Sequence, residues 1–545
     1  MGWFTENSTV QRALAAYADS SATHKAIAAI VLVILVQRVL SKPQKHNLFP
    51  VWATIEVGVA SYVLRGHGWG RRIYSSIRKY GGSLFGISKA HQVFVHLPDL
   101  DRVMTQSVHA LNADPVQYTL FTRVFGAPDE IELKTNLERS WKDLIAPLER
   151  LFLNDKNSAA AVERANIPQL ANSFVTFSSD PAQMNRWEMS ADIQVVKPNL
   201  LGNPGSVEAN LQSLTRDFGA CMAIPLLYGK DFLERCPQLL DDFWKFDNDL
   251  FPLLMIGIPP WAPFKMVKEG RAARSRMHQQ LAALYRRIDQ YQKGEPVDFG
   301  ADMSDVSIVP LERNKVYQKN HWSFPERGVA DFTVLWGQNG NTQPTLFWLL
   351  TYIYSTPDLL DRVREDIAPY IQLSETDPLE VTSIDLPGLF RNCQLLKACL
   401  FETYRMSNEP ASIRYVERPV TIKDGEFKHE LKPGTFITVP HALVNSDPTV
   451  FADPDTFVPE RFLETDAEGK MVARYSRLRP WGVGPSMCKG RTFAEKELLA
   501  LGAAILSLWS IDPVGGTWRL PAMIPGTGVK KPVKDIRVSI TRRTL

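Results

Sequence analysis

Cysteine is scarce in this chain of 545 residues, which contains only five: Cys221, Cys236, Cys393, Cys399 and Cys488. No two of them form a CxxC pair, and a sparse, odd set does not make a disulfide framework. We therefore expect the functional part of the protein to lie in a reducing compartment, with most of these thiols buried as small apolar groups. Only the surroundings of Cys488 predict chemistry.

The sequence also lacks an excess of charge of either sign. Its formal net charge is +3, and no basic patch is interleaved with aromatic residues, so nucleic-acid binding is not predicted. Internal repeats and low-complexity linkers are missing as well. With 45% hydrophobic and 22% charged residues, the composition is that of a globular protein.

The hydrophobic patterning of the chain is mainly helical. Helical periodicity covers 208–224, 236–254 and 270–292, whereas strand-like runs are short and scattered, at 93–97, 413–416 and 435–439. Because no linker divides this part of the chain, we predict a mostly α fold with minor β, forming one domain over residues 46–545.

Long apolar runs are rare, and the main one lies near the N-terminus. Residues 26–36 are all apolar, which is short of the roughly 20 residues that span a bilayer. Lys25 and Arg38 at the two ends could snorkel to the interfaces and complete the length. We interpret residues 1–45 as a tail and membrane anchor with a span of about 22–41; a signal-peptide core and a buried helix are the alternatives. Basic residues after the run weakly place the large C-terminal part in the cytosol.

The segment 481–491 reads Trp-Gly-Val-Gly-Pro-Ser-Met-Cys-Lys-Gly-Arg and precedes a helical pattern that begins at about Arg491. Its glycines permit a tight turn and the close approach of a flat ligand; they are Gly482, Gly484 and Gly490. The N-terminus of the following helix supplies the positive potential that a Cys488 thiolate needs. Such a loop suits a thiolate ligand to haem iron; the alternative is a turn that holds a buried free cysteine.

A second unusual segment places polar residues inside an apolar helical pattern over 327–355. Gly340, Asn341 and Thr342 are followed by Pro344. Pro344 has no N–H for the carbonyl of Gly340, and its ring crowds that same carbonyl, so a kink is predicted there. The polar side chains must face a cavity or find partners. The alternative is an ordinary packing helix kinked by proline.

Two charged segments lie between the polar helix and the cysteine loop. Glu402 and Arg405 share one face of a predicted helix and can pair, although an ExxR pattern alone is expected by chance in a chain of this length. Arg461 follows in the sequence Pro-Glu-Arg-Phe, and Arg414 lies in a predicted strand. A solvated strand arginine remains an alternative for Arg414.

In this order, these segments resemble the cytochrome P450 superfamily. The cysteine loop is similar to its haem-binding signature, with Trp481 in place of the usual Phe and Ser486 in place of a common basic residue. The resemblance implies that Cys488 is the axial ligand of haem b, that Glu402, Arg405 and Arg461 form a structural network, and that Arg414 binds a haem propionate. It also implies that Gly340 lines the distal pocket.

The resemblance implies proton-delivery roles for Thr342 and Asn341. The family usually has an acid where this chain has Asn341, and an amide cannot relay a proton by its own titration. The Asn-Thr pair is similar to one branch, which contains the sterol 7α- and 12α-hydroxylases and prostacyclin synthase. Asn341 therefore leaves open a reductase-independent isomerase or dehydratase of a peroxide beside the monooxygenase.

The leading hypothesis is a haem-thiolate monooxygenase of a lipophilic small molecule such as a steroid, a terpenoid or another secondary metabolite. The family implies electrons from NADPH through a cytochrome P450 reductase, with cytochrome b5 as a candidate second partner. The expected location is the endoplasmic reticulum membrane, with a single span and the catalytic domain in the cytosol. A haem-binding protein without catalysis is the alternative from another functional class.

Overall fold

The computed structural model describes residues 103–197, 205–255, 258–424, 427–524 and 528–544, together with the backbone of two strands at 84–88 and 91–94. The fold is mostly helical with a minor part of sheet, as the sequence predicted. The expected membrane span at about 22–41 lies outside the described residues. Within the described part of the chain, no helix is long and apolar enough to cross a membrane.

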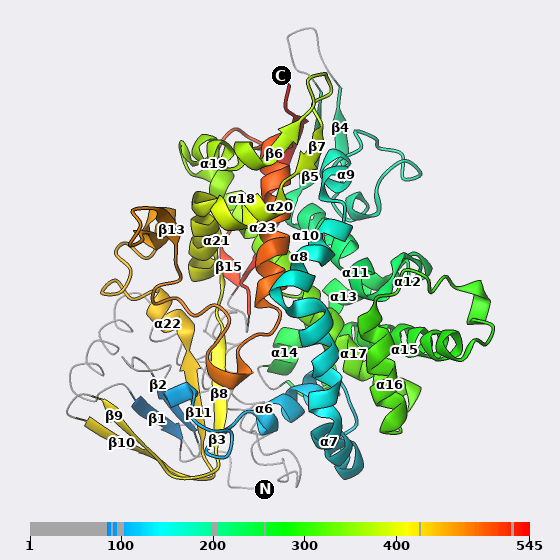
Figure 1. Cartoon of the computed structure of the whole chain (residues 1–545), viewed down its shortest axis with the longest axis vertical. Helices are drawn as coiled ribbons and strands as arrows, with labels where there is room; N and C mark the ends of the chain where they lie inside the picture. The colour runs from blue at the N-terminus through cyan, green and yellow to red at the C-terminus, as the bar shows by residue number, and fades with distance from the viewer. Residues whose placement is uncertain are drawn as a thin grey trace, which may run out of the picture.

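Helices make up most of the molecule in Figure 1. In chain order they are α6 (Asp114–Thr119), α7 (Ile131–Leu148), α8 (Asp155–Arg164), α9 (Ile167–Asn172), α10 (Leu211–Ala223), α11 (Pro225–Tyr228), α12 (Lys230–Arg235), α13 (Leu239–Lys245), α14 (Phe251–Met255), α15 (Lys265–Lys293), α16 (Ile308–Lys319), α17 (Phe324–Asn339), α18 (Thr342–Ser355), α19 (Leu359–Ile367), α20 (Leu386–Asn392), α21 (Gln394–Ser407), α22 (His441–Asn445) and α23 (Arg491–Leu508). Helix α18 is buried on nearly all sides, and it packs against α10, α21 and α23. A helix that is mostly apolar suits this central place, and its few polar side chains are buried with it.

The sheets lie beside and above the helical body (Figure 1). A five-stranded sheet has the order β1 (Leu84–Ser88), β2 (His91–Phe94), β11 (Phe436–Pro440), β8 (Ala411–Val416) and β3 (Leu111–Asn112). A four-stranded antiparallel sheet has the order β14 (Trp509–Pro513), β17 (Arg537–Arg542), β5 (Ser206–Asn210) and β4 (Gln194–Val196). The remaining strands form pairs: β6 (Ile371–Leu373) with β7 (Val381–Ile384), β9 (Val420–Asp424) with β10 (Phe427–Leu431), β12 (Leu463–Thr465) with β13 (Met471–Ala473), and β15 (Met523–Ile524) with β16 (Lys531–Pro532).

Two of the three predicted helical patterns differ from the structure in their course. The pattern at 208–224 begins as strand β5, because Ser206–Asn210 pairs with both β4 and β17 and this pairing overrides the helical periodicity. The pattern at 236–254 is divided among α13, the π-helical segment η4 (Phe246–Leu250) and α14. The pattern at 270–292 is confirmed and extended, since α15 covers Lys265–Lys293.

The predicted kink before Pro344 is a full break between two helices. Helix α17 ends at Asn339 and α18 begins at Thr342, so Gly340 and Asn341 lie between them. Asn341 has φ −113° and ψ −36°, which departs from regular helix. Regular helix is therefore interrupted just before the proline, which has no backbone donor.

Candidate functional site

The cysteine loop is closed by its own backbone. The Cys488 N–H donates to the carbonyl of Trp481 at 2.9 Å, and the short turn η8 (Gly484–Ser486) lies between them. Gly484 has φ +73°, and a Cβ built on it would lie 2.2 Å from the carbonyl oxygen of Met104. No larger residue fits there without moving the backbone, so this glycine fixes the course of the loop.

Cys488 is accessible from solvent, although protein atoms surround much of its sulfur. The residue is exposed, yet enough protein lies around the sulfur for desolvation to raise its pKa. Backbone hydrogen bonds from Gly490 and Arg491, together with the positive charge of Arg491, act in the opposite direction and lower that pKa. These two residues begin α23, so the helix N-terminus is directed at the sulfur as the sequence predicted.

The other four cysteines have no comparable support for a thiolate. Burial raises the pKa of Cys221 and of Cys393 to about 12, and that of Cys236 to about 11. Burial also raises the pKa of Cys399 well above its usual value. Cys221 is partly buried and the other three are buried, whereas Cys488 is the cysteine with backbone donors at its sulfur.

Arg414 is buried beside the cysteine loop and is not solvated. It is 5% exposed, and its Nη2 donates to the carbonyl oxygen of Val483 at 3.0 Å. Burial lowers the pKa of its guanidinium, and no carboxylate among the described residues pairs with it. An uncompensated buried cation next to the cysteine loop is suited to an anionic group such as a haem propionate.

Trp481 joins the cysteine loop to the neighbouring helices. Its indole N–H donates to the hydroxyl of Tyr475 at 2.9 Å, and Tyr475 in turn donates to Glu495 of α23. The ring of Trp481 also makes an edge contact with Tyr404 of α21, with centroids 5.1 Å apart. The aromatic residue at the start of the loop is thus held by two helices at once.

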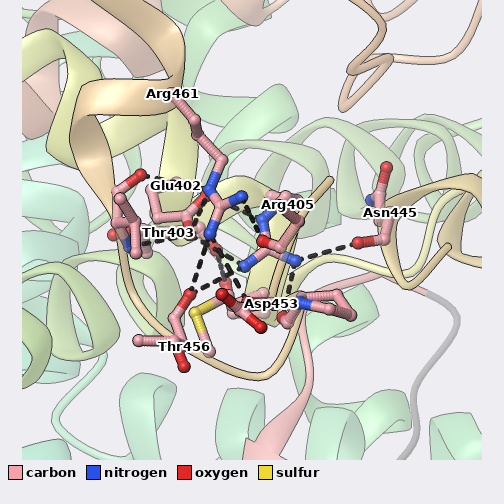
Figure 2. A network of polar contacts seen from close by, with 12 residues as sticks. Glu402, Thr403, Arg405, Asn445, Asp453, Thr456 and Arg461 are labelled. Carbon is pink, nitrogen blue, oxygen red and sulfur yellow. Dashed lines mark hydrogen bonds and ion pairs between the residues drawn. The ribbon is translucent and has the colours of Figure 1, made fainter. Parts of the chain in front are cut away.

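Glu402, Arg405 and Arg461 come together in a buried network (Figure 2). Arg405 donates to both oxygens of Glu402, from Nε at 2.7 Å and from Nη2 at 2.8 Å, and Arg461 Nε donates to Glu402 Oε1 at 3.1 Å. Glu402 is fully buried and Arg405 is 3% exposed. Arg405 Nη1 also donates to the carbonyl of Asn445 at 2.9 Å, so the network joins α21 to the chain that follows β11.

Asn341, at the break between α17 and α18, has a structural partner. Its side-chain oxygen accepts the N–H of Val529 at 3.1 Å. A Cβ built on Gly528 would lie only 2.1 Å from that same oxygen, so glycine is needed for the approach. The same oxygen therefore holds the C-terminal segment at the break, and the proton-delivery role of Asn341 beside Thr342 stays a prediction. Thr342 is buried as the first residue of α18.

Gly340, the predicted wall of the distal pocket, lies against the indole ring of Trp336, a residue for which no role was predicted. A Cβ on Gly340 would be 2.8 Å from Nε1 of Trp336. That nitrogen donates to Asp247 of η4 at 2.8 Å, and Asp247 is also paired with Lys531 of β16. Three segments of the chain therefore meet one turn before the break. The signal in the sequence that could have indicated this cluster is Asp247, an acidic residue inside the helical pattern 236–254.

A buried polar pair lies between α18 and α23. Gln343, which follows Thr342, donates from Nε2 to Glu497 Oε1 at 2.9 Å. Burial raises the pKa of Glu497 to about 8. The other oxygen of each side chain is buried without a hydrogen-bond partner in the described part of the chain. Among the hydrogen bonds of the described residues, none joins Thr342 to the Cys488 loop. The Gln343–Glu497 hydrogen bond joins α18 to α23, which also pack against one another.

These residues fit a haem group held by a thiolate. The donor set is a reachable sulfur with two backbone N–H groups directed at it, and a buried cation without a carboxylate partner lies beside the same loop. Gly490 leaves room beside the sulfur, since a Cβ there would only touch it at 3.8 Å. Cys488 would hold the iron, and Arg414 would neutralise a propionate.

Comparisons with known proteins agree with this geometry. The family model described as Cytochrome P450 matches residues 230–539. The chain is 28% identical over 318 residues to the cytochrome P450 monooxygenase poxD of Penicillium oxalicum, covering 58% of this chain and 60% of that protein. It is 26% identical over 303 residues to cytochrome P450 7B1 of Mus musculus, covering 52% and 55%.

A third relative is the 7-alpha-hydroxycholest-4-en-3-one 12-alpha-hydroxylase of Homo sapiens, which is 28% identical over 220 residues. This match covers 38% of the chain and 43% of the human protein, so the chain matches between 43% and 60% of the length of these three relatives. The family model, in contrast, covers more than half of the chain and includes both the Glu402 network and the Cys488 loop. The chain belongs to the cytochrome P450 family.

Proposed function

We propose that this protein is a haem-thiolate monooxygenase that oxidises a lipophilic small molecule. The observation that carries the proposal is the Cys488 thiol, which is exposed on one side while N–H groups of Gly490 and Arg491 support its negative charge. The bound haem supplies the activation of dioxygen, for which a thiolate ligand favours cleavage of the O–O bond.

The protein's own residues then have distinct tasks. Cys488 would hold the iron, and the N–H groups at the start of α23 act against the burial that raises the pKa of its thiol. Arg414 would neutralise a propionate of the group, from a buried place where water does not compete. Gly340 lines the distal pocket at the break, with Thr342 beside it as a hydroxyl that holds and passes a proton. Asn341 supports this arrangement by fixing Val529.

The proposed substrate is a steroid, a terpenoid or a similar lipophilic metabolite. Relatives named as hydroxylases of sterols, and a fungal monooxygenase, support this class. The electrons would come from NADPH through a cytochrome P450 reductase, with cytochrome b5 as a second candidate partner. We further propose a haem domain over 46–545, anchored in the endoplasmic reticulum membrane by the span at about 22–41, with the domain in the cytosol.

The first test is the carbon monoxide difference spectrum of the reduced protein. The thiolate proposal requires a strongly red-shifted Soret band that is lost in both Cys488→Ala and Cys488→His. A histidine-like band in the wild type, or a red-shifted band that persists in Cys488→Ala, would show that Cys488 is not the ligand. Wild-type protein that takes up no haem would exclude the haem enzyme altogether.

A second candidate function is a reductase-independent isomerase or dehydratase of a peroxide. It is favoured by Asn341, which stands where the family usually has an acid and cannot exchange a proton by titration. Product formed from an organic hydroperoxide without NADPH or reductase would support it, whereas strict dependence of turnover on NADPH would support the monooxygenase. Haem binding with no turnover under either condition would indicate a non-catalytic haem-binding protein.

A further inference from the structure

A surface cleft of about 620 Å³ lies between the start of α15, the loop 260–263 and Gly126, and no residue of the cysteine loop lines it. Arg271 of α15 reaches across to the loop, where its Nη1 donates to the carbonyl of Pro260 at 3.0 Å. Arg274, one turn further along, donates to the carbonyl of Val124. Hydrogen bonds from α15 thus fix two separate segments of the cleft wall, at Pro260 and at Val124.

The cations that line this cleft are unmatched. Lys268, Arg271 and Arg274 face it, no aspartate or glutamate lines it, and none of the three is in an ion pair among the described residues. Other cations of the same helix do have carboxylate partners; they are Lys265, Arg276, Arg286 and Lys293. Arg287, further along α15, also has no ion pair in the described part of the chain and lies over the ring of Phe299. The other cations of this helix without a carboxylate partner gather where it borders the cleft.

Two partly buried polar side chains, Arg274 and His278, belong to the lining of the cleft. Burial and the neighbouring Arg271 lower the pKa of Arg274 to about 10. Its guanidinium rests on the backbone of Gly126, whose Cβ would lie 2.6 Å from the guanidinium carbon. Nε2 of His278, in the same lining, is buried and has no hydrogen-bond partner in the described part of the chain. Buried polar atoms normally have partners, so these groups are suited to a ligand that brings an anion and a hydroxyl.

Large apolar side chains are exposed at Trp261 of the lining and at two positions that follow it in the chain. Trp261 is 75% exposed, Phe264 is 48% exposed and Met266 is 46% exposed. Exposed apolar residues beside cations are typical of surfaces that touch the interface of a membrane. We propose that the cleft binds the head group of an anionic membrane phospholipid, whose phosphate contacts Arg271 and Arg274 and whose hydroxyl donates to His278. The proposal is independent of the reaction that the haem site performs.

The test uses the full-length protein in detergent and counts bound lipid by native mass spectrometry during titration with phosphatidylglycerol. The variant Arg271→Gln/Arg274→Gln removes both phosphate contacts. The matched control, Arg286→Gln/Lys293→Gln, removes the same charge from α15 outside the cleft. Lipid that binds to other basic segments is equal in all three proteins. An unchanged carbon monoxide difference spectrum shows that each variant is folded.

We expect one lipid site of the wild type to weaken at least about tenfold in Arg271→Gln/Arg274→Gln, because a lost charge-assisted hydrogen bond commonly costs about that factor. The control double variant keeps the site, and phosphatidylcholine does not fill it. Equal loss in the control, or no loss in either variant, would overturn the proposal. Displacement of the lipid by millimolar inorganic phosphate would show that the cleft takes free phosphate and would overturn the lipid assignment.

Discussion

Trp336 and Asp247 are 89 positions apart, and the indole Nε1 of the first donates to the carboxylate of the second at 2.8 Å. The same carboxylate accepts the ammonium of Lys531, which also donates to the backbone carbonyl of Asp247 at 2.7 Å. The ring of Trp336 is stacked on Phe251 with centroids 4.7 Å apart. One buried carboxylate thus joins η4, α17 and β16 immediately before the break between α17 and α18.

Removing that carboxylate should be costly. Asp247→Ala leaves the ammonium of Lys531 and the indole N–H of Trp336 without their partner, and we expect a loss of about 3–5 kcal/mol in the free energy of unfolding. Denaturant titration of the purified protein measures it. The double variant Asp247→Ala/Lys531→Met should recover a large part of the loss, since it no longer strands a charge. An equally unstable double variant would contradict this account.

Arg414 gives a prediction in which haem affinity and stability separate. Arg414→Met removes a buried, unmatched cation, so we expect the haem-free protein to be at least as stable as the wild type. Haem retention should fall at least about tenfold, because a charge-assisted contact to a propionate is lost. The rate of haem transfer to apomyoglobin measures retention, and Arg414→Lys should be intermediate. Unchanged haem transfer in Arg414→Met would exclude Arg414 as the propionate partner.

Glu402 is expected to be essential for folding, whereas an exposed pair nearby is not. Glu402→Gln leaves Arg405 and Arg461 facing one another without a carboxylate, at a predicted cost of about 3–5 kcal/mol. The control is Arg362→Gln, which breaks an exposed ion pair with Glu460 and should cost less than about 1 kcal/mol. Thermal unfolding of both variants, read together with haem content, tests the difference. Similar losses in the two variants would argue against the buried network.

Glu497 predicts a definite dependence of stability on pH. Its pKa is raised from 4.5 to about 8 in the folded protein, so between these values the folded state keeps a proton that the unfolded state has lost. Stability from this group therefore falls as pH rises from about 4.5 to about 8 and is constant above that. Glu497→Gln should remove this slope. Denaturant titrations of wild type and variant at pH 6, 7, 8 and 9 measure it, and parallel curves would contradict the assignment.

The local parts of the site could be predicted from the sequence. Three features of the site act within a few residues and therefore leave a pattern in the sequence. They are the glycines around Cys488, the proline after the break between α17 and α18, and the spacing of Glu402 and Arg405. The structure places the break and the Glu402 pair where these patterns indicate. The mostly helical fold followed in the same way from periodicity.

The long-range parts could not be predicted. Val529 meets Asn341 from 188 positions away, and a single backbone N–H leaves no signal in the sequence. For this reason Asn341 was interpreted through the chemistry of its amide, although its oxygen has a structural task. The strand Ser206–Asn210 was missed for a related reason, because its conformation depends on β17 rather than on its own periodicity.

The contact between Val529 and Asn341 also sets an order for events during synthesis. Residues 207–210 and 341 leave the ribosome long before residues 529–540, yet the partners of β5 in β17 and of Asn341 in the C-terminal segment lie there. The nascent chain must therefore hold an unpaired strand edge and an unsupported helix break while it waits, a state in which exposed strands favour wrong association. The pairing of β5 with β17 and the contact of Asn341 with Val529 are consequently late steps of folding. We expect chaperones to protect the chain until they form.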